Sequence, residues 1–327
     1  MPTSLKLEDP RPDRADTSQT NSGLQGLGAT RLFAIFAVIL VGMHGLPLYR
    51  LMRYSLENSL WSHILLIPWI SMYLAWGKKR EIPAAAPAFS LYAGIPLVLG
   101  ISALSTFWVL RLRGWEFATA DYLSLTTLAF VSFLCSGAAW IFGPARIRAL
   151  AFPLAFLIFM VPFPTIVTHR LETFLQHASA EAAALMLGIS QTSVLRDGLF
   201  FKLPGITIEV AEECSGIRST LVLFITSLVG AHMFFQSRAH RALLAFAVVP
   251  IAIVRNGFRI FTIAMLCVHV SPDMIHSWIH RRGGPLFFAL SLIPFGMLLI
   301  YLYRRERTVR AGRKAFEICR NLKPETP

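Results

Sequence analysis

The sequence predicts an all-α polytopic membrane protein with about eight transmembrane helices, a short periplasmic β-hairpin and an interfacial helix. Of the 327 residues, 55% are hydrophobic and only 15% are charged, whereas soluble chains have roughly 25% charged residues. The apolar residues form blocks of about 16 to 20, long enough to cross a hydrocarbon core roughly 30 Å thick. The formal net charge is +13, but the Lys and Arg residues stand beside these blocks. Basic residues in such positions orient a protein in the membrane and form no extended patch for nucleic acid.

The N-terminal segment, residues 1–30, is rich in Ser, Thr, Asp and Pro. It cannot bury enough apolar surface to order itself, so we expect a disordered cytoplasmic lead. The first apolar block begins at Leu32 and lacks the small-residue cleavage site of a removable signal peptide. We therefore expect a membrane anchor there, a transmembrane domain over residues 31–303 and a basic cytoplasmic tail over residues 304–327.

The predicted spans are the long apolar blocks between charged or turn-forming connectors. The segment Leu171–Leu187 is apolar but interrupted by Glu172, His177 and Glu181, which predicts an amphipathic helix in the membrane interface. Alternatively, this segment is a ninth element that dips into the protein. The spans are Leu32–Leu48, His63–Trp76, Ser90–Leu110, Tyr122–Phe142, Ala149–Val167, Ile217–Phe235, Ala242–Val270 and Pro285–Tyr303.

The distribution of basic residues predicts that the N-terminus is cytoplasmic. With this orientation the successive inner connectors each carry a basic cluster, as the positive-inside rule requires. Some basic residues fall on the outer side and count against it. The inner residues are Lys78, Lys79, Arg80, Arg146, Arg148, Arg238, Arg241, Arg304, Arg305, Arg307 and Arg310, and the outer ones are Arg111, Arg113, Arg170, Arg196, Lys202, Arg281 and Arg282.

A short hairpin is predicted in the long outer connector before the sixth span. Between residues 198 and 210, β-branched and aromatic residues flank the turn-forming pair Pro204-Gly205. Its second strand leads directly into Glu212-Glu213-Cys214-Ser215-Gly216. We therefore expect this polar segment to lie at the outer boundary of the sixth span.

Three chemically capable residues from distant parts of the chain are predicted to meet at this outer face. Cys214 stands just before the sixth span, and His280 lies in the outer connector between the seventh and eighth spans. Arg259 lies about 17 residues into the seventh span, which raises it roughly 25 Å from the cytoplasmic end. A thiol, an imidazole and a guanidinium in one place form a possible centre for nucleophilic catalysis.

Cys214 differs from the other three cysteines because polar residues flank it. A cysteine acts as a nucleophile only as the thiolate, which a helix N-terminus and nearby His or Arg side chains favour. Ser215-Gly216 opens an apolar run, so the thiol would stand at such an N-terminus. Glu212 and Glu213 disfavour a thiolate by their charge, and are expected instead to orient His280, Arg255 or the substrate. The alternative is an inert buried cysteine.

Arg255 and Arg259 are spaced i, i+4 and so share one face of the seventh span. An arginine at the centre of a span costs at least about 2.5–3.5 kcal/mol on insertion scales, so it normally has a partner and a function. The alternative is that both side chains snorkel, or bind buried carbonyls and lipid phosphate.

His276 and His280 are also spaced i, i+4, which is a geometry that can hold a metal. The residues between them include no Glu that would act as a general base, and no third ligand is evident. We therefore predict no metal and no cofactor. His280 is the favoured base because the following Gly283-Gly284 gives a turn that could present its ring, and His276 is the alternative.

Several of these segments together resemble the exosortase and archaeosortase family, in particular the bacterial exosortases that sort PEP-CTERM proteins. Upstream segments, Trp61 to Trp76 and Phe152 to Pro164, also look like spans of that family, so the resemblance covers about residues 60 to 303. The segments that carry it are Glu209 to Ser219, Val254 to Ile260, and His280 with Gly283-Gly284 and Phe287-Phe288.

The resemblance implies a multipass cysteine protease or transpeptidase of the bacterial inner membrane, with its active site facing the periplasm. Such a hydrolase would cleave C-terminal PEP-CTERM-like sorting signals and transfer the protein to an acceptor, in connection with exopolysaccharide export. The implied partners are membrane-anchored protein substrates, the lipid bilayer and exopolysaccharide assembly proteins, with no nucleic acid. The alternative function is a non-catalytic transporter or flippase of a lipid or polysaccharide intermediate.

The resemblance also implies roles for individual residues. Cys214 would be the nucleophile, His280 the acid–base, and Arg259 the clamp for the oxyanion or substrate. The Asn-x-x-Arg-Ile context favours Arg259 over Arg255 for this role. The residues implied to support the site or bind substrate are Glu212, Glu213, Ser215, Gly216, Arg218, Arg255, Asn256 and His276.

Overall fold

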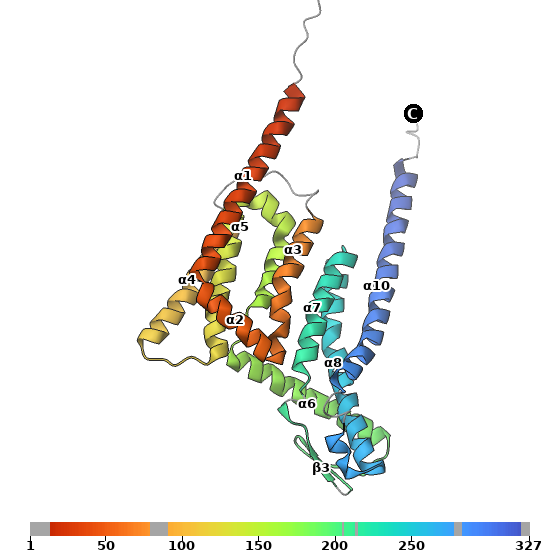
Figure 1. The fold of residues 1–327 in the computed structure, drawn as a ribbon. Helices are drawn as coiled ribbons and strands as arrows, with labels where there is room; N and C mark the ends of the chain where they lie inside the picture. Colours follow the sequence, from red (N-terminus) through yellow and green to blue (C-terminus); the bar gives the residue numbers. More distant parts are fainter. Residues whose placement is uncertain (1–13, 79–90, 205, 213–214, 278–282, 322–327) are drawn as a thin grey trace, which may run out of the picture. The chain divides into compact units, whose positions relative to one another are not determined.

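The computed structural model describes residues 14–78, 91–204, 206–212, 215–277 and 283–321 (Figure 1). The chain divides into two units, Met1–Pro164 and Thr165–Pro327. All regular elements among the described residues of the first unit are helices. Its elements are α1 (Arg14–Met43), α2 (Gly45–Glu57), the 3-10 helix η1 (Ser59–Leu66), α3 (Ile67–Gly77), α4 (Leu91–Leu112), α5 (Thr119–Phe156) and the 3-10 helix η2 (Leu157–Met160).

The second unit combines helices with one small sheet. Its helices pack around α8, which contacts α6, α7 and α10. The elements are α6 (Thr165–Ile189), β1 (Leu195–Asp197), β2 (Phe200–Leu203), β3 (Ile206–Glu209), α7 (Ile217–Phe234), α8 (Arg238–His269), the 3-10 helix η4 (Pro272–His276) and α10 (Gly284–Asn321).

The predicted class of fold, a helical polytopic membrane protein, is confirmed. Among the described residues, six helices are long and apolar enough to cross a membrane, or seven if the bent pair α1 and α2 forms one span. One of the six runs from Thr119 to Met160 and covers what the sequence predicted as two spans. This accounts for part of the difference from the predicted number of about eight.

The element α5 is folded back on itself at Gly143, which has a φ of 75° and a ψ of 169°. The Ser124 hydroxyl donates to the Pro162 carbonyl at 2.5 Å, although the two residues are far apart in sequence. The Cys135 thiol likewise lies 3.8 Å from the Leu154 carbonyl. Both pairs are centred close to Gly143, so the element is an antiparallel helical hairpin, as Figure 1 shows. A glycine occupies the corner because a positive φ is unfavourable for other residues.

Two predicted spans in the first unit have different boundaries in the structure. The expected span Leu32–Leu48 is broken at His44, where α2 turns by 75° from α1. The His44 ring packs near Phe130 and Phe133, so tertiary contacts hold the chain at the bend. The expected span Ala149–Val167 ends early, since η2 stops at Met160 and a new helix starts at Thr165. Helix α1 begins at Arg14, and residues 1–13 of the expected N-terminal lead lie outside the described residues.

The predicted hairpin is present, and a third strand extends it. The sheet has the antiparallel order β1-β2-β3, with Phe201 opposite Ile208. Phe201, Leu203 and Ile208 are buried while alternate residues face outward. This buried face packs on α6 and α8, and the shared core contains Ala180, Ala183, Leu187, Ile260, Ile263, Ala264 and Cys267.

The segment predicted to be an interfacial helix, Leu171–Leu187, forms the central part of α6. This helix is not among those long and apolar enough to cross a membrane. It packs closely along α8, because Gly257 of α8 allows the two backbones to approach. A Cβ atom added at Gly257 would lie 2.6 Å from the Ala182 Cβ and 3.1 Å from the Ala183 nitrogen. Helix α6 therefore lies against both the sheet and the face of α8 beside the candidate site.

The last helix continues past Tyr303, where the sequence predicted the end of the span, and reaches Asn321. Its Glu306 carboxylate is buried and accepts hydrogen bonds from the backbone nitrogens of Gln236 and Ser237, at 2.9 and 3.1 Å. His240 lies 2.9 Å from the same carboxylate, and Arg310 pairs with it. One carboxylate thus links α10 to the turn between α7 and α8.

Candidate active site

Two of the three predicted catalytic residues, Cys214 and His280, lie outside the described residues. Glu213 lies outside them as well, and only the backbone of His276, at the end of η4, is described. Arg259 is described, and its side chain is half-buried on α8. The site is therefore built from the residues that flank position 214 and from the face of α8.

The segment upstream of position 214 is anchored at Val210. This residue is 2% exposed and follows directly on β3. Its N–H donates to the Leu199 carbonyl at 3.0 Å, and its carbonyl accepts from the Gln176 side-chain amide at 2.5 Å. Gln176 is itself buried on α6. A buried hydrogen bond of this kind fixes the chain because breaking it leaves a polar group without a partner.

Glu212 points outward from this segment. Its carboxylate lies 3.8 Å from the His169 ring nitrogen, and both side chains are mostly exposed. Its backbone carbonyl accepts a hydrogen bond from the Ser215 N–H at 2.9 Å. The described residues on the two sides of positions 213 and 214 are therefore hydrogen-bonded to one another.

The segment downstream of position 214 is buried and conformationally special. Ser215 is 2% exposed, and Gly216 is the N-cap of α7 with a φ of 73° and a ψ of 13°. A Cβ atom at Gly216 would lie 2.8 Å from the Arg255 guanidinium and 3.1 Å from the Asn256 side chain. Both the left-handed backbone and the close contact require a residue without a side chain here.

The carbonyl of Gly216 collects several donors. It accepts from the N–H of Thr220 at 3.0 Å, and from the Ser219 and Thr220 hydroxyls at 3.0 and 2.9 Å. The Arg255 guanidinium approaches the same oxygen at 3.5 Å. The first turn of α7 is thus attached to α8 through the residue that stands two positions after Cys214.

The facing part of α8 carries the polar residues that the sequence singled out. Arg255 is 7% exposed and Asn256 is 3% exposed, so both are buried against Gly216. Arg259 lies one helical turn further along the same helix face. Arg218, in contrast, is exposed on the first turn of α7. The structure therefore brings together Ser215, Gly216, Arg255 and Asn256, and leaves Glu212 and Arg218 at the surface.

This arrangement creates an environment suited to an anion. The first N–H groups of a helix have no partner within the helix, and the helix dipole adds partial positive charge there. Gly216 has no side chain with which to cap those groups. Beside them lies the buried Arg255 guanidinium. Both features favour negative charge in the neighbourhood of Ser215.

The two histidines considered as metal ligands, His276 and His280, have side chains outside the described residues. Within the described part of the chain, no three His, Cys, Asp or Glu side chains are placed to hold a metal ion. The structure therefore does not test a metal site formed by these two histidines.

Two residues near the site were not identified from the sequence. Gln176 stands on the same buried face of α6 as Ala180 and Ala183, and a polar residue within that apolar face was the available signal. His169 gives no local signal, since it lies near Glu212 only after α6 has packed beside the sheet. Both residues flank the segment that leads to position 214.

Comparison with known proteins identifies one family. The family described as transmembrane exosortase (Exosortase_EpsH) matches residues 55–307. The matched range includes the sheet, the start of α7 and the part of α8 that carries Arg255 and Arg259. No curated protein and no solved structure matches the chain. The resemblance inferred from the sequence motifs is thereby confirmed. Because the match spans well over half of the 327 residues, the chain belongs to the transmembrane exosortase family.

Proposed function

We propose that this exosortase is a cysteine-type peptidase and transpeptidase that cleaves C-terminal PEP-CTERM-like sorting signals. Family membership supports the coarser statement that the chain is a membrane protein that processes proteins bearing sorting signals. In the proposal, Cys214, Arg259 and His280 act at the periplasmic face of the bacterial inner membrane. The substrates are membrane-anchored proteins, and their transfer to an acceptor serves exopolysaccharide export.

The observation that carries the proposal is the conformation of the chain immediately after Cys214. Gly216 adopts a positive φ and lies against Arg255 and Asn256, which belong to the helix that also carries Arg259. Val210 and Ser215 fix the chain on the two sides of the polar segment by buried contacts. A nucleophile requires such preorganisation, because its position relative to the oxyanion donors determines the rate.

The first half of the proposed reaction forms a thioester. The Cys214 thiolate attacks the carbonyl carbon of the scissile peptide bond, while His280 holds the proton taken from the thiol. Arg259 stabilises the tetrahedral oxyanion, a contribution worth about 3–4 kcal/mol when one such donor is removed in other enzymes. The C–N bond then breaks, and the departing amine takes the proton from His280.

The second half transfers the acyl group. His280 accepts a proton from the incoming nucleophile, which attacks the thioester carbonyl. The C–S bond breaks, and Cys214 returns to the thiolate form beside protonated His280. An amine acceptor makes the reaction a transpeptidation, and a water molecule makes it a hydrolysis.

The proposal is tested by co-expressing the chain with a tagged substrate that carries a sorting signal, and following its cleavage on a blot. We expect Cys214→Ala and His280→Ala to abolish cleavage and Cys214→Ser to reduce it severely. Arg259→Ala should slow it by at least about a hundredfold, since it removes the oxyanion donor. Cys135→Ala is the matched control, because that thiol is half-buried within α5, and it should cleave as the wild type does.

Other outcomes would support the alternative functions. Unchanged cleavage by Cys214→Ala would end the thiol mechanism. Loss of lipid or polysaccharide export after substitution of Arg255 and Arg259, together with indifference to Cys214→Ala, would favour a transporter. Loss of cleavage on chelation would favour a metal site at His276 and His280.

A further inference from the structure

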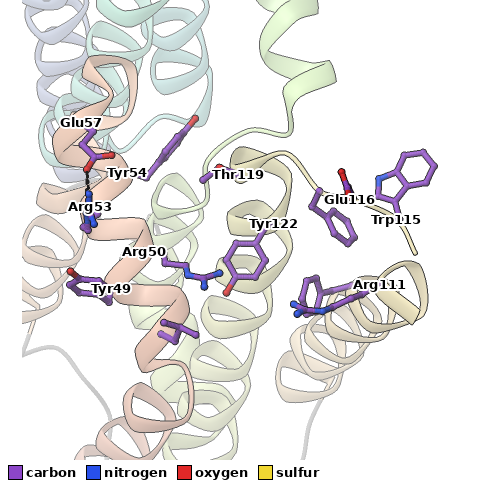
Figure 2. Close-up of a pocket in the computed structure, with 13 residues that line it drawn as sticks. Tyr49, Arg50, Arg53, Tyr54, Glu57, Arg111, Trp115, Glu116, Thr119 and Tyr122 are labelled. Atoms are coloured by element: carbon purple, nitrogen blue, oxygen red, sulfur yellow. Dashed lines mark hydrogen bonds and ion pairs between the residues drawn. The ribbon is translucent and has the colours of Figure 1, made fainter. Parts of the chain in front are cut away.

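The first unit contains a cavity of about 720 Å³ that has no residue in common with the candidate active site. It lies where α2, the end of α4 and the start of α5 come together (Figure 2). Arginine and aromatic side chains dominate its lining, notably Tyr49, Arg50, Tyr54, Arg111 and Tyr122, and the lining also includes the carboxylates of Glu57 and Glu116. This combination of cationic and aromatic groups points to an anionic ligand with an apolar part.

One continuous face of α2 lines the cavity. Its lining residues begin at Leu46 and end at Glu57, with the spacings of three and four that place side chains on the same side of a helix. The opposite face is buried in the protein, since Leu51 is 3% exposed and Ser55 is 1% exposed. Packing of that buried face therefore fixes the rotation of α2 and directs Arg50 and Arg53 toward the cavity.

The arginines of the cavity differ in their partners. Arg53 forms an ion pair with Glu57 at 2.6 Å. The Arg50 guanidinium points toward the Tyr122 ring (Figure 2) and lies 5.4 Å from its centre, and that of Arg111 lies 5.8 Å from the centre of the Phe107 ring. Within the part of the chain that the structure describes, no carboxylate pairs with Arg50 or Arg111. An aromatic face leaves the N–H groups at the edge of a guanidinium able to bind an anion.

The cavity lies at the ends of membrane-spanning helices. Helix α4 ends at Leu112 and α5 begins at Thr119, so Arg111 and Tyr122 stand where spans meet the headgroup region. Trp115 is 65% exposed and Tyr49 is 53% exposed, as is typical of the aromatic belts at a membrane interface. Lipid phosphates occupy this level of the bilayer. A lipid phosphate therefore reaches the arginines without leaving its normal depth.

The cavity also explains the position of Arg111, which the positive-inside rule does not. Arg111 counts against the predicted orientation, because it falls on the outer side. A role in ligand binding accounts for its presence there. Arg113, two residues further on, does not line the cavity.

We propose that this cavity binds the phosphate group of an anionic membrane lipid, with Arg50 and Arg111 as the principal donors. The tyrosines and Trp115 surround the glycerol region, and the acyl chains extend along apolar side chains such as Leu46, which is 59% exposed. The proposal is independent of the proposed peptidase activity, since it involves neither Cys214 nor the residues of α8.

The test is native mass spectrometry of the full-length protein released from detergent micelles. The lipids are phosphatidylglycerol and, as a probe without phosphate, diacylglycerol; inorganic phosphate and an acidic peptide are added as competitors. We expect wild type and the control Arg113→Gln to retain phosphatidylglycerol, and the double variant Arg50→Gln/Arg111→Gln to bind it at least about tenfold more weakly. Arg50→Lys/Arg111→Lys, which keeps the charge, should recover part of the binding.

Each contrary result assigns the cavity differently. Equal binding of phosphatidylglycerol by the Gln double variant, in protein with a wild-type circular dichroism spectrum, would overturn the proposal. Equal retention of diacylglycerol would show that the phosphate is not recognised, and would overturn it also. Displacement of phosphatidylglycerol by inorganic phosphate at the same concentration would assign the cavity to free phosphate, and displacement by the peptide would assign it to an acidic polypeptide.

Discussion

An added methyl group at Gly216 would collide with the polar side chains of α8. The Cβ atom would lie 2.8 Å from the Arg255 guanidinium, and the backbone has a φ of 73°. We therefore predict that Gly216→Ala lowers the free energy of unfolding by about 1–3 kcal/mol, through strain in the left-handed conformation and displacement of Arg255. Thermal unfolding in detergent and cleavage of the tagged substrate measure the two consequences.

Gly230→Ala is the matched control for that substitution. Gly230 lies inside the same helix, and its Cβ would meet only the Leu299 side chain at 3.7 Å, an ordinary contact. Alanine is the better helix former, so this variant should be as stable as the wild type or slightly more stable. Equal behaviour of Gly216→Ala and Gly230→Ala would show that the close contact at Gly216 contributes nothing.

At the scale of single residues, the sequence predicts which residues have a special chemical or conformational role better than it predicts which residues contact one another. The sequence places Gly216 at the start of an apolar run, and the structure shows a conformation specific to glycine there. The contact of Gln176 gives no such local signal, because its hydrogen bond is with Val210, far along the chain. Pairing of distant polar groups depends on how α6 packs, and no local pattern encodes that.

At the scale of elements, α6 holds the end of the sheet in place through Gln176. We predict that Gln176→Leu costs about 1–3 kcal/mol, because the buried Val210 carbonyl loses its side-chain donor. Amide hydrogen exchange across residues 206–212 should become faster, and cleavage of the tagged substrate should fall as the segment before Cys214 loosens.

The neighbouring residue supplies the control for this element. His177 is exposed, and its ring nitrogen lies 2.9 Å from the Thr173 carbonyl of the same helix. His177→Ala should leave both hydrogen exchange and cleavage unchanged. If Gln176→Leu exchanges no faster than His177→Ala, the amide of Gln176 does not restrain the sheet.

A second attachment between these elements depends on pH. Arg196 of β1 donates to Glu181 of α6 at 2.8 Å and lowers the pKa of that carboxyl. A carboxyl group whose pKa is lowered in the folded protein stabilises the fold at pH values above its ordinary pKa. This stabilisation is lost as the pH falls through the lowered pKa. Because Glu181 is largely exposed, solvent screens the pair and the effect is small.

The elements themselves were predicted well where a local pattern determines them. The hairpin around Pro204 and the start of α7 at Ile217 follow from turn residues and an apolar run. The bend at His44 was missed, because hydropathy reports an apolar segment and not the packing of His44 near Phe130. Helix α10 passes the predicted boundary for a related reason. Hydropathy marks where the bilayer ends, whereas the helix continues through residues of good helical propensity.

At the scale of the whole molecule, orientation in the membrane follows from the basic connectors. We predict that a reporter fused after Lys78 is cytoplasmic and that one fused after Gly198 is periplasmic, because basic clusters are retained on the cytoplasmic side. Alkaline phosphatase, active only after export, and green fluorescent protein, fluorescent in the cytoplasm, give opposite readings at the two points.

A third fusion, after Gly114, tests the orientation of the first unit at a second connector. It lies in the connector between α4 and α5 and should report the same side as the fusion after Gly198. Phosphatase activity after Lys78, or fluorescence after Gly198, would reverse the orientation and place the candidate site in the cytoplasm.

The link that the Glu306 carboxylate makes between α10 and the turn before α8 has a practical consequence for handling the protein. Its carboxylate receives the backbone N–H groups that precede α8, the helix of Arg255 and Arg259. Mechanical load applied to the far end of α10 is therefore transmitted to the start of α8 through this carboxylate, in addition to the apolar packing of the two helices. Bulky affinity tags or surface tethers at the carboxyl terminus would load this contact, so immobilisation through the amino terminus is the safer choice for assays.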